Sequence, residues 1–256
     1  AGVPCDGCEP WEDAHRPAVI GASPDGRWLS RRKARSWVAI DREAGHVVGW
    51  VADAARLTQY ELGRPLHSQL LLWYGDRGIQ AVHAGLVSLD GNGVLIGGPS
   101  GAGKSTVALS CMGAGFDYLA DDYVGLESLG DVGYAGHSLY GSAHLDPKHL
   151  ERFPELAPWA IPGTPPREDK SLIFLSDVPG ARLSPGAPVR AVVLPRVANA
   201  PATTFRRASR VEALVRLAPS SLLMVPYTTI RDGFDRLARF VGAVPVYWLE
   251  LGREVS

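Results

Sequence analysis

The chain has 256 residues, enough for one large domain or for a catalytic domain with a small companion. Hydrophobic residues make up 46% of the sequence and charged residues 21%, which is usual for a globular protein in water. The formal net charge of -1 provides no overall field that would attract nucleic acid or an anionic membrane. We therefore expect neither as a partner.

Two further features of the composition concern the membrane and the cysteines. No apolar run approaches the ~20 residues of a membrane-spanning helix, and the first residues lack the pattern of a signal peptide. Cys5 and Cys8 form a C-x-x-C pair, but a structural zinc site needs about four ligands and the third cysteine, Cys111, lies far along the chain. We expect a frayed terminus there and a cytoplasmic protein.

The first quarter of the chain differs from the rest in its pattern of predicted secondary structure. Residues 37–50 predict two short strands around a turn at 43–45. Residues 63–65, Gly-Arg-Pro, predict a boundary. The sequence thus favours a small β-containing unit at 1–66, followed by a larger domain at 67–256.

Beyond that boundary, strands and helices alternate, which predicts an α/β fold. Residues 141–170 are rich in proline, histidine and charge, and predict an irregular excursion of the kind that often covers an active site. Apolar spacing, turn residues and capping patterns predict, in chain order, a helix over 66–74, strands over 79–87 and 93–96 around a turn at 90–93, a helix from 105 to about 112, strands over 117–120, 171–175 and 191–197, helices over 210–217 and 230–241, and a strand over 246–251.

The run from Gly98 to Ser105 fits the phosphate-loop pattern G-x-x-x-x-G-K-[ST], with an apolar strand before it and a helix-forming run after it. Glycines let successive backbone N–H groups face a phosphate at the helix N-terminus. Lys104 would reach the β- and γ-phosphates, and the Ser105 hydroxyl would ligate Mg²⁺. The pattern predicts a bound nucleoside triphosphate, but leaves kinase, ATPase, GTPase and transporter motor open. The predicted nucleotide-binding residues are Gly98, Pro99, Ser100, Gly101, Ala102, Gly103, Lys104, Ser105 and Thr106.

Two aspartates, Asp121 and Asp122, end an apolar stretch one short helix after the loop. Their strand is expected to run parallel to the strand before the loop, so that both end at the same edge of the sheet. There, one carboxylate can hold Mg²⁺ and the other can accept a proton from a substrate hydroxyl. Their closeness in sequence to Lys104 favours a compact kinase core over a motor ATPase. The alternative is an exposed Asp-Asp turn.

His83 falls on the predicted strand before the turn at 90–93. A single histidine on a strand is more often a packed core residue than a catalytic one, so its position alone favours a structural role.

Together, residues 83–87, 98–105 and 120–122 resemble the catalytic core of the bacterial HPr serine kinase/phosphorylase family, at closely similar spacings. The resemblance covers about residues 79–126. It implies a phosphate-loop core similar to that of phosphoenolpyruvate carboxykinase, and phosphorylation of a serine hydroxyl by Mg²⁺ and ATP.

Carried over by position, the resemblance implies specific roles for the residues named above. Asp122 would accept the proton, and Asp121 would be a carboxylate on the metal side, with Ser105. His83 would lie beside the loop near the transferred phosphate, and Ser100 would line the loop.

The chain departs from the family after the aspartate pair. The family carries an E-I-R-G-L-G stretch tied to the reverse, phosphorylase reaction, whereas residues 138–143 here contain neither Glu nor Arg. This argues against the phosphorylase reaction and against the HPr protein as substrate. Residues 139–143, 169–170, 217–221 and 244–252 are more similar to the HPr-kinase-like enzymes of lasso-peptide biosynthesis, which phosphorylate a serine, typically at the precursor peptide's C-terminus.

The resemblance therefore implies a peptide or protein partner with a serine hydroxyl, and a homo-oligomer, since related kinases are often oligomers. Transfer also needs positive charge beyond Lys104, and Arg167, Lys170 and Arg182 are candidates as well as ordinary surface residues. Two other functions remain open: a kinase for the hydroxyl of a small sugar or amino acid, and an ATP-binding regulatory module without transfer.

Overall fold

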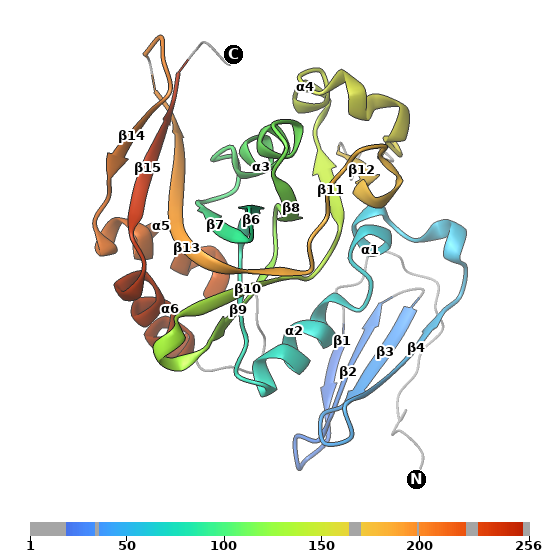
Figure 1. Cartoon of the computed structure of the whole chain (residues 1–256). Coiled ribbons are helices and arrows are strands. Elements are labelled where there is room, and N and C mark those ends of the chain that lie inside the picture. Colours follow the sequence, from blue (N-terminus) through green and yellow to red (C-terminus); the bar gives the residue numbers. More distant parts are fainter. Residues whose placement is uncertain (1–18, 34–35, 164–169, 199, 224–229, 253–256) are drawn as a thin grey trace.

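The computed structural model describes residues 19–33, 36–163, 170–198, 200–223 and 230–252. The cysteine pair and Arg167, considered above, lie outside these ranges. The described residues form a mixed α/β structure in which a small sheet lies beside a larger, sheet-rich core (Figure 1). Within these ranges no helix is both long and apolar enough to cross a bilayer.

The small sheet confirms the two strands predicted in residues 37–50 and adds two more. Four antiparallel strands pair in the order of the chain. One face of the sheet carries Leu29 and Ile40, which pack against Leu72 of the following helix. The strands are β1 (Val19–Ala22), β2 (Trp28–Lys33), β3 (Ser36–Asp41) and β4 (His46–Val51).

Three helical elements connect the small sheet to the core: η1 (Ala54–Arg56), α1 (Gln59–Gly63) and α2 (His67–Asp76). A capping box between Thr58 and Glu61 begins α1. The helix predicted over 66–74 continues to Asp76. Gly78, with φ 79°, takes the positive-φ position that lets the chain leave the helix.

Within the described part of the chain, the large sheet has nine strands. Seven follow the order β5-β9-β10-β13-β7-β6-β8, and β15 pairs with β13 on one side and with β14 on the other. Because β6 pairs antiparallel with both β7 and β8, these two strands run in the same direction, as predicted. The strands are β5 (Gln80–Val82), β6 (Ala84–Leu89), β7 (Asn92–Gly97), β8 (Asp117–Ala120), β9 (Val124–Ser128), β10 (Tyr134–Ser138), β13 (Gly186–Val197), β14 (Thr204–Arg207) and β15 (Val246–Leu251).

The single strand predicted over residues 79–87 is instead two strands, separated by His83. β5 pairs with β9, whereas β6 pairs with β7 and β8, so the chain changes partners at this residue. Since β5 and β6 are almost continuous yet lie near opposite ends of the strand order, the sheet curls back on itself. His83 therefore sits at a bend rather than within a ladder.

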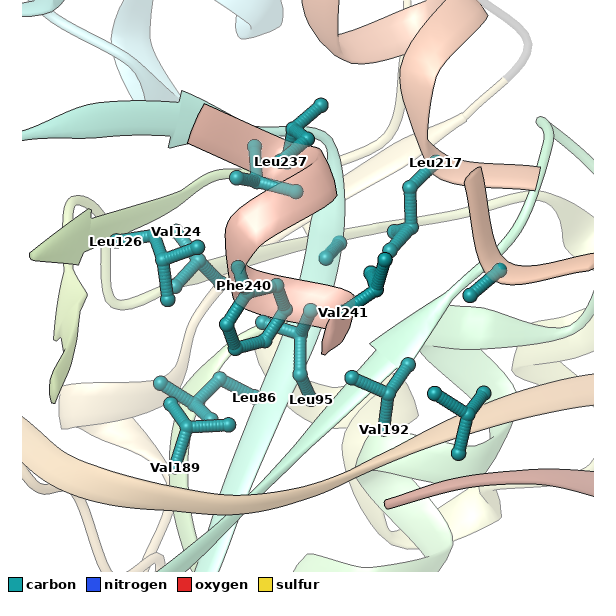
Figure 2. Packing of buried hydrophobic residues seen from close by; sticks show 14 of the residues in the cluster. Leu86, Leu95, Val124, Leu126, Val189, Val192, Leu217, Leu237, Phe240 and Val241 are labelled. Atoms are coloured by element: carbon teal, nitrogen blue, oxygen red, sulfur yellow. The ribbon is translucent and has the colours of Figure 1, made fainter. Parts of the chain in front are cut away.

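Both faces of the sheet around β7 are buried, as expected for a strand rich in Val, Leu and Ile. Leu95 points to the face covered by α5 (Arg210–Leu222) and α6 (Ile230–Ala243), where Phe240 packs against Leu86 and Leu95 (Figure 2). Ile96 points to the opposite face, which is covered by α3 (Lys104–Gly113). The strand before the phosphate loop is thus held rigidly from two sides.

The predicted irregular excursion is more ordered than expected. It contains β11 (Ser142–Leu145), α4 (Pro147–Leu150) and η3 (Pro154–Trp159). β11 pairs antiparallel with β12 (Ser171–Phe174), which follows along the chain. This two-stranded ribbon packs beside α3, and its buried Leu145 and Ile173 join the same cluster as Ile96.

Candidate active site

The phosphate loop leaves the buried end of β7 and enters α3. Gly98, Gly101 and Gly103 have φ angles of 152°, 79° and 93°, which residues with a side chain rarely adopt. A Cβ atom at Gly98 would also lie 2.9 Å from the Cβ of Ala102. The glycines are therefore required by this curled backbone.

Lys104 begins α3 and is buried, with 6% of its surface exposed. Its ammonium donates to the carbonyl oxygens of Gly98 and Pro99, at 3.0 and 3.1 Å. Burial lowers the pKa of Lys104, while Asp122 and Asp121 oppose that change. The lysine is thus enclosed by its own loop, in the position from which it could reach a phosphate.

A cavity of about 270 Å³ opens beside this loop. Residues predicted from the sequence line it together, although they come from four segments: the bend at His83, the loop with the start of α3, the aspartate pair, and Lys170. His83, Ser100, Gly101, Gly103, Lys104, Ser105, Thr106, Asp121 and Asp122 line the cavity, and so do Arg64, His144, Asp146, His149 and Lys170. Arg182 does not: it is exposed and pairs with Asp117, 2.8 Å away.

Asp121 follows β8 directly and is buried, so its carboxylate is held at the edge where β7 also ends. Burial and the adjacent Asp122 carboxylate raise the pKa of Asp121, whereas Arg64 and the Ser105 hydroxyl act to lower it. A buried carboxylate beside a loop serine is a donor set that suits Mg²⁺.

Asp122 is paired on both of its carboxylate oxygens, one with Arg64 and the other with Nε2 of His83. Burial acts to raise the pKa of Asp122, but the hydrogen bond from His83 and the charge of Arg64 outweigh it. They hold that pKa below the usual range of an aspartate. Asp122 is therefore an ionised carboxylate in the described structure.

The bend between β5 and β6 turns His83 toward Asp122. Its backbone N–H donates to the Ser221 hydroxyl of α5 at 3.0 Å, which anchors the bend. The Nδ1 atom of His83 is buried and has no hydrogen-bond partner among the described residues. The histidine is thus part of the site and not only of the core, contrary to the structural role favoured by its position in the sequence.

Arg64 is the most deeply engaged of the site residues that sequence reasoning missed, the others being His144, Asp146 and His149. It lies between α1 and α2, has 8% of its surface exposed, and stacks over the rings of Tyr60 and Tyr123 at 4.6 and 5.0 Å. One of its N–H groups donates to Nδ1 of His144 at 3.3 Å. Residues 63–65 were interpreted only as a boundary, because nothing local distinguishes an arginine that joins a distant site from an ordinary loop arginine.

The residues present fit a nucleoside triphosphate with Mg²⁺. The loop offers backbone N–H groups at a helix N-terminus and an enclosed lysine, and Ser105 and Asp121 offer oxygen ligands. Asp122 lies in the same cavity as a separate carboxylate. A site that combines these groups can bind phosphate and bring a hydroxyl to a proton acceptor.

Residues 78–146 match the family model described as the HPr Serine kinase C-terminal domain. The matched segment is HPr-kinase-like. It contains His83, the phosphate loop and both aspartates, and spans roughly a quarter of the 256 residues. The match supports a phosphotransferase.

Among solved structures, the chain is similar to the Hpr(Ser) kinase/phosphatase from Coxiella burnetii. The similarity covers 69% of this chain and 81% of that chain, with 14% sequence identity and a TM-score of 0.35. No curated protein matches the chain.

His67 begins α2 and packs against the Tyr123 ring, with a centroid separation of 4.3 Å. Burial, and then the charge of Arg64, lower the pKa of His67 from 6.5 to about 4. The unfolded chain therefore binds this proton near pH 6.5 and the folded chain only near pH 4. The contribution of His67 to the free energy of unfolding is fully present above pH 6.5 and is lost as the pH falls toward 4. Acidification from pH 7 to pH 5 should therefore lower the free energy of unfolding by about 2 kcal/mol through this residue.

Urea unfolding of wild type and His67→Gln at pH 7 and pH 5 measures this contribution. The wild type should lose about 2 kcal/mol more than the variant over that interval. His46→Gln, on exposed β4, is the matched control and should behave as wild type. Equal losses in wild type and His67→Gln would contradict the prediction.

Proposed function

We propose that the chain is a kinase that transfers the γ-phosphate of Mg²⁺–ATP to a serine hydroxyl of a peptide or protein. The observation that carries the proposal is that residues of the phosphate loop, Lys104 and Ser105 among them, line one cavity together with the Asp121–Asp122 pair. The match of residues 78–146 to the HPr serine kinase domain supports the same reaction.

In this proposal the loop N–H groups and Lys104 hold the phosphates, and Ser105 with Asp121 holds the metal. Mg²⁺ held there would supply positive charge that offsets the negative charge developing during transfer. Asp121 is well suited to this task, because its burial makes the carboxylate gain more from an adjacent cation than it would in water.

Asp122 is proposed to accept the proton of the acceptor. The serine oxygen bonds to the γ-phosphorus, the bond from that phosphorus to the bridging oxygen breaks, the hydroxyl proton passes to Asp122, and ADP leaves. The ion pair with Arg64 makes Asp122 a weak base in the described structure. A phosphate in the cavity competes for the same guanidinium, so substrate binding should restore the basicity of Asp122.

Arg64 lies at the predicted boundary between the two parts of the chain and lines the catalytic cavity. If residues 1–66 are a unit separate from 67–256, that unit supplies a buried cation to the catalytic cavity. We propose that Arg64 fills the role considered above for Arg167, Lys170 and Arg182, namely the additional positive charge near the transferred phosphate.

The segment that departs from the HPr kinase pattern holds Arg64 in place. Ser142 donates to the carbonyl oxygen of Gly63 at 2.7 Å, and the Tyr140 hydroxyl donates to that of Pro65 at 3.1 Å. This use of residues 138–143 supports an acceptor other than the HPr protein. We propose a peptide acceptor of the lasso-precursor type, on the similarity of the secondary motifs.

Mass spectrometry tests the proposal directly. The protein is incubated with Mg²⁺–ATP and a panel containing peptides that end in serine, peptides with internal serine, and an HPr protein. We expect phosphate on serine of a peptide and none on the HPr protein. If polypeptides stay unmodified while small hydroxyl compounds drive ADP release, the acceptor is wrong. If ATP binds but no acceptor drives ADP release, the kinase proposal itself is wrong.

A further inference from the structure

A second cavity, of about 150 Å³, lies between the small sheet and the start of α2, and Arg64 lines both this cavity and the catalytic one. Part of its lining comes from the small sheet and part from residues 64–69. Arg64 pairs with Asp122, so a group bound here would be linked through Arg64 to the residue proposed to accept the proton.

The register of the small sheet explains why this space exists. Arg31 pairs with Val38 and Lys33 with Ser36, so these four residues share the face that carries Leu29 and Ile40. The Leu29 end of that face is filled by Leu72 of α2. At the other end, Gly49 stands opposite Val38 and contributes no side chain. The face is left open there and is lined by both charged and apolar residues.

Of the three described cationic side chains that line this cavity, two are in ion pairs, whereas Arg31 bonds to a neutral hydroxyl. Lys33 is paired with Glu61, and Arg64 with Asp122. Arg31 donates from Nη1 to the Ser68 hydroxyl, and its Nε atom is buried without a hydrogen-bond partner among the described residues. A buried guanidinium N–H that lacks an acceptor is costly, so Arg31 would gain from an anion that draws its side chain into the cavity that it lines.

The N-terminal end of α2 adds positive electrostatic potential to the same cavity. Leu66, the N-cap residue, makes no side-chain hydrogen bond to the helix, and the first residues of α2 line the cavity. The N–H groups of a first helical turn have no partner within the helix and favour negative charge. Arg31 and this helix end thus act on one small volume, whose remaining wall includes the apolar Val38, Val51 and Leu57.

We propose that this cavity binds a carboxylate of the acceptor, carried close to the hydroxyl that is phosphorylated, with Arg31 as its principal partner. The inference rests on the proposed function and deepens it, because it assigns the acceptor's chemical class: a peptide segment with a carboxylate and an apolar neighbour. The carboxylate is either the chain terminus or an acidic side chain next to the serine, and the test separates these two sources.

Steady-state transfer is measured with three short peptides: one ending in serine with a free carboxylate, its C-terminal amide, and an amide with aspartate beside the serine. Wild type should show a KM about ten-fold or more lower for a carboxylate-bearing peptide than for the plain amide, with little change in kcat. Preference for the first peptide identifies the terminus as the source, and preference for the third identifies an acidic side chain.

Arg31→Gln should remove that preference by raising the KM of the carboxylate peptide about ten-fold, while leaving the plain amide and the KM for ATP unchanged. Arg32→Gln is the matched control, since Arg32 alternates to the other face of β2 and does not line the cavity. Equal KM values for all three peptides in wild type, or an equal loss in both variants, would overturn the proposal.

A binding measurement separates failure of this inference from failure of the proposed function. N-acetylserine and its amide are titrated into the full chain and followed by NMR. If no peptide is phosphorylated, the kinase proposal fails; weaker binding of the acid to Arg31→Gln than to wild type would still establish the anion site. If peptides are phosphorylated but the acid and the amide bind equally, the function stands and the carboxylate site is refuted.

Discussion

Replacement of Lys104 by alanine should reduce phosphoryl transfer by about 10²–10³-fold or more and weaken nucleotide binding. The ammonium is buried within the loop, 3.0 Å from the carbonyl oxygen of Gly98. Water that enters the space left by the side chain would bring no positive charge to the phosphates. Alanine leaves the glycine-rich backbone intact but removes the only lysine enclosed by the described loop.

Transfer and nucleotide affinity are measured in parallel, with a fluorescent ATP analogue for the second. Lys148→Ala is the matched control, because Lys148 is exposed on α4 and does not line the cavity. It should retain both activities. A Lys104→Ala protein that binds and transfers as well as Lys148→Ala would show that the loop is structural, and would remove the basis of the proposed function.

The parts of the site that the sequence predicted are those specified locally. The phosphate loop depends on glycine conformations and on a strand and helix that adjoin it in the chain. Asp121 and Asp122 were placed at the same edge because one short helix returns the chain in the direction of β7. The conformation of each of these features depends on residues close to it in the sequence, so a local sequence pattern is enough to predict it.

The features that were missed depend on distant partners. The strand ladder breaks at His83 because β5 and β6 bind different strands, which no local pattern records. β11 and β12 form a ribbon only by pairing across the excursion between them. Arg64 enters the site because residues 140 and 142 fix the loop that carries it.

Helix α5 is a further case in which the sequence pattern did not predict the extent of an element. The helix predicted over 210–217 continues through Pro219 to Leu222. The proline leaves the Val215 carbonyl without its helical donor, and Val215 is 65% exposed, so water can replace that bond. The continuation places Ser221 where it accepts the backbone N–H of His83. A weakened helical turn thus supports the bend in the active site.

Asp122→Asn should lower kcat by about 10²–10⁴-fold while nucleotide affinity is retained. The amide has the shape of the carboxylate and can still accept a hydrogen bond from Arg64 or His83, but it cannot take the proton of the acceptor. Loss of a negative charge beside the phosphates should, if anything, tighten nucleotide binding.

Single-turnover transfer with saturating Mg²⁺–ATP isolates the chemical step from nucleotide binding. Asp131→Asn, an exposed residue in the turn between β9 and β10, controls for the substitution itself. Asp122→Glu tests whether the proton acceptor or the position matters: a carboxylate on a longer side chain should recover part of the rate that asparagine loses. Equal rates for wild type and Asp122→Asn would eliminate Asp122 as the base. His83, whose Nε2 contacts that carboxylate and whose Nδ1 has no partner among the described residues, would then be the next proton acceptor to test.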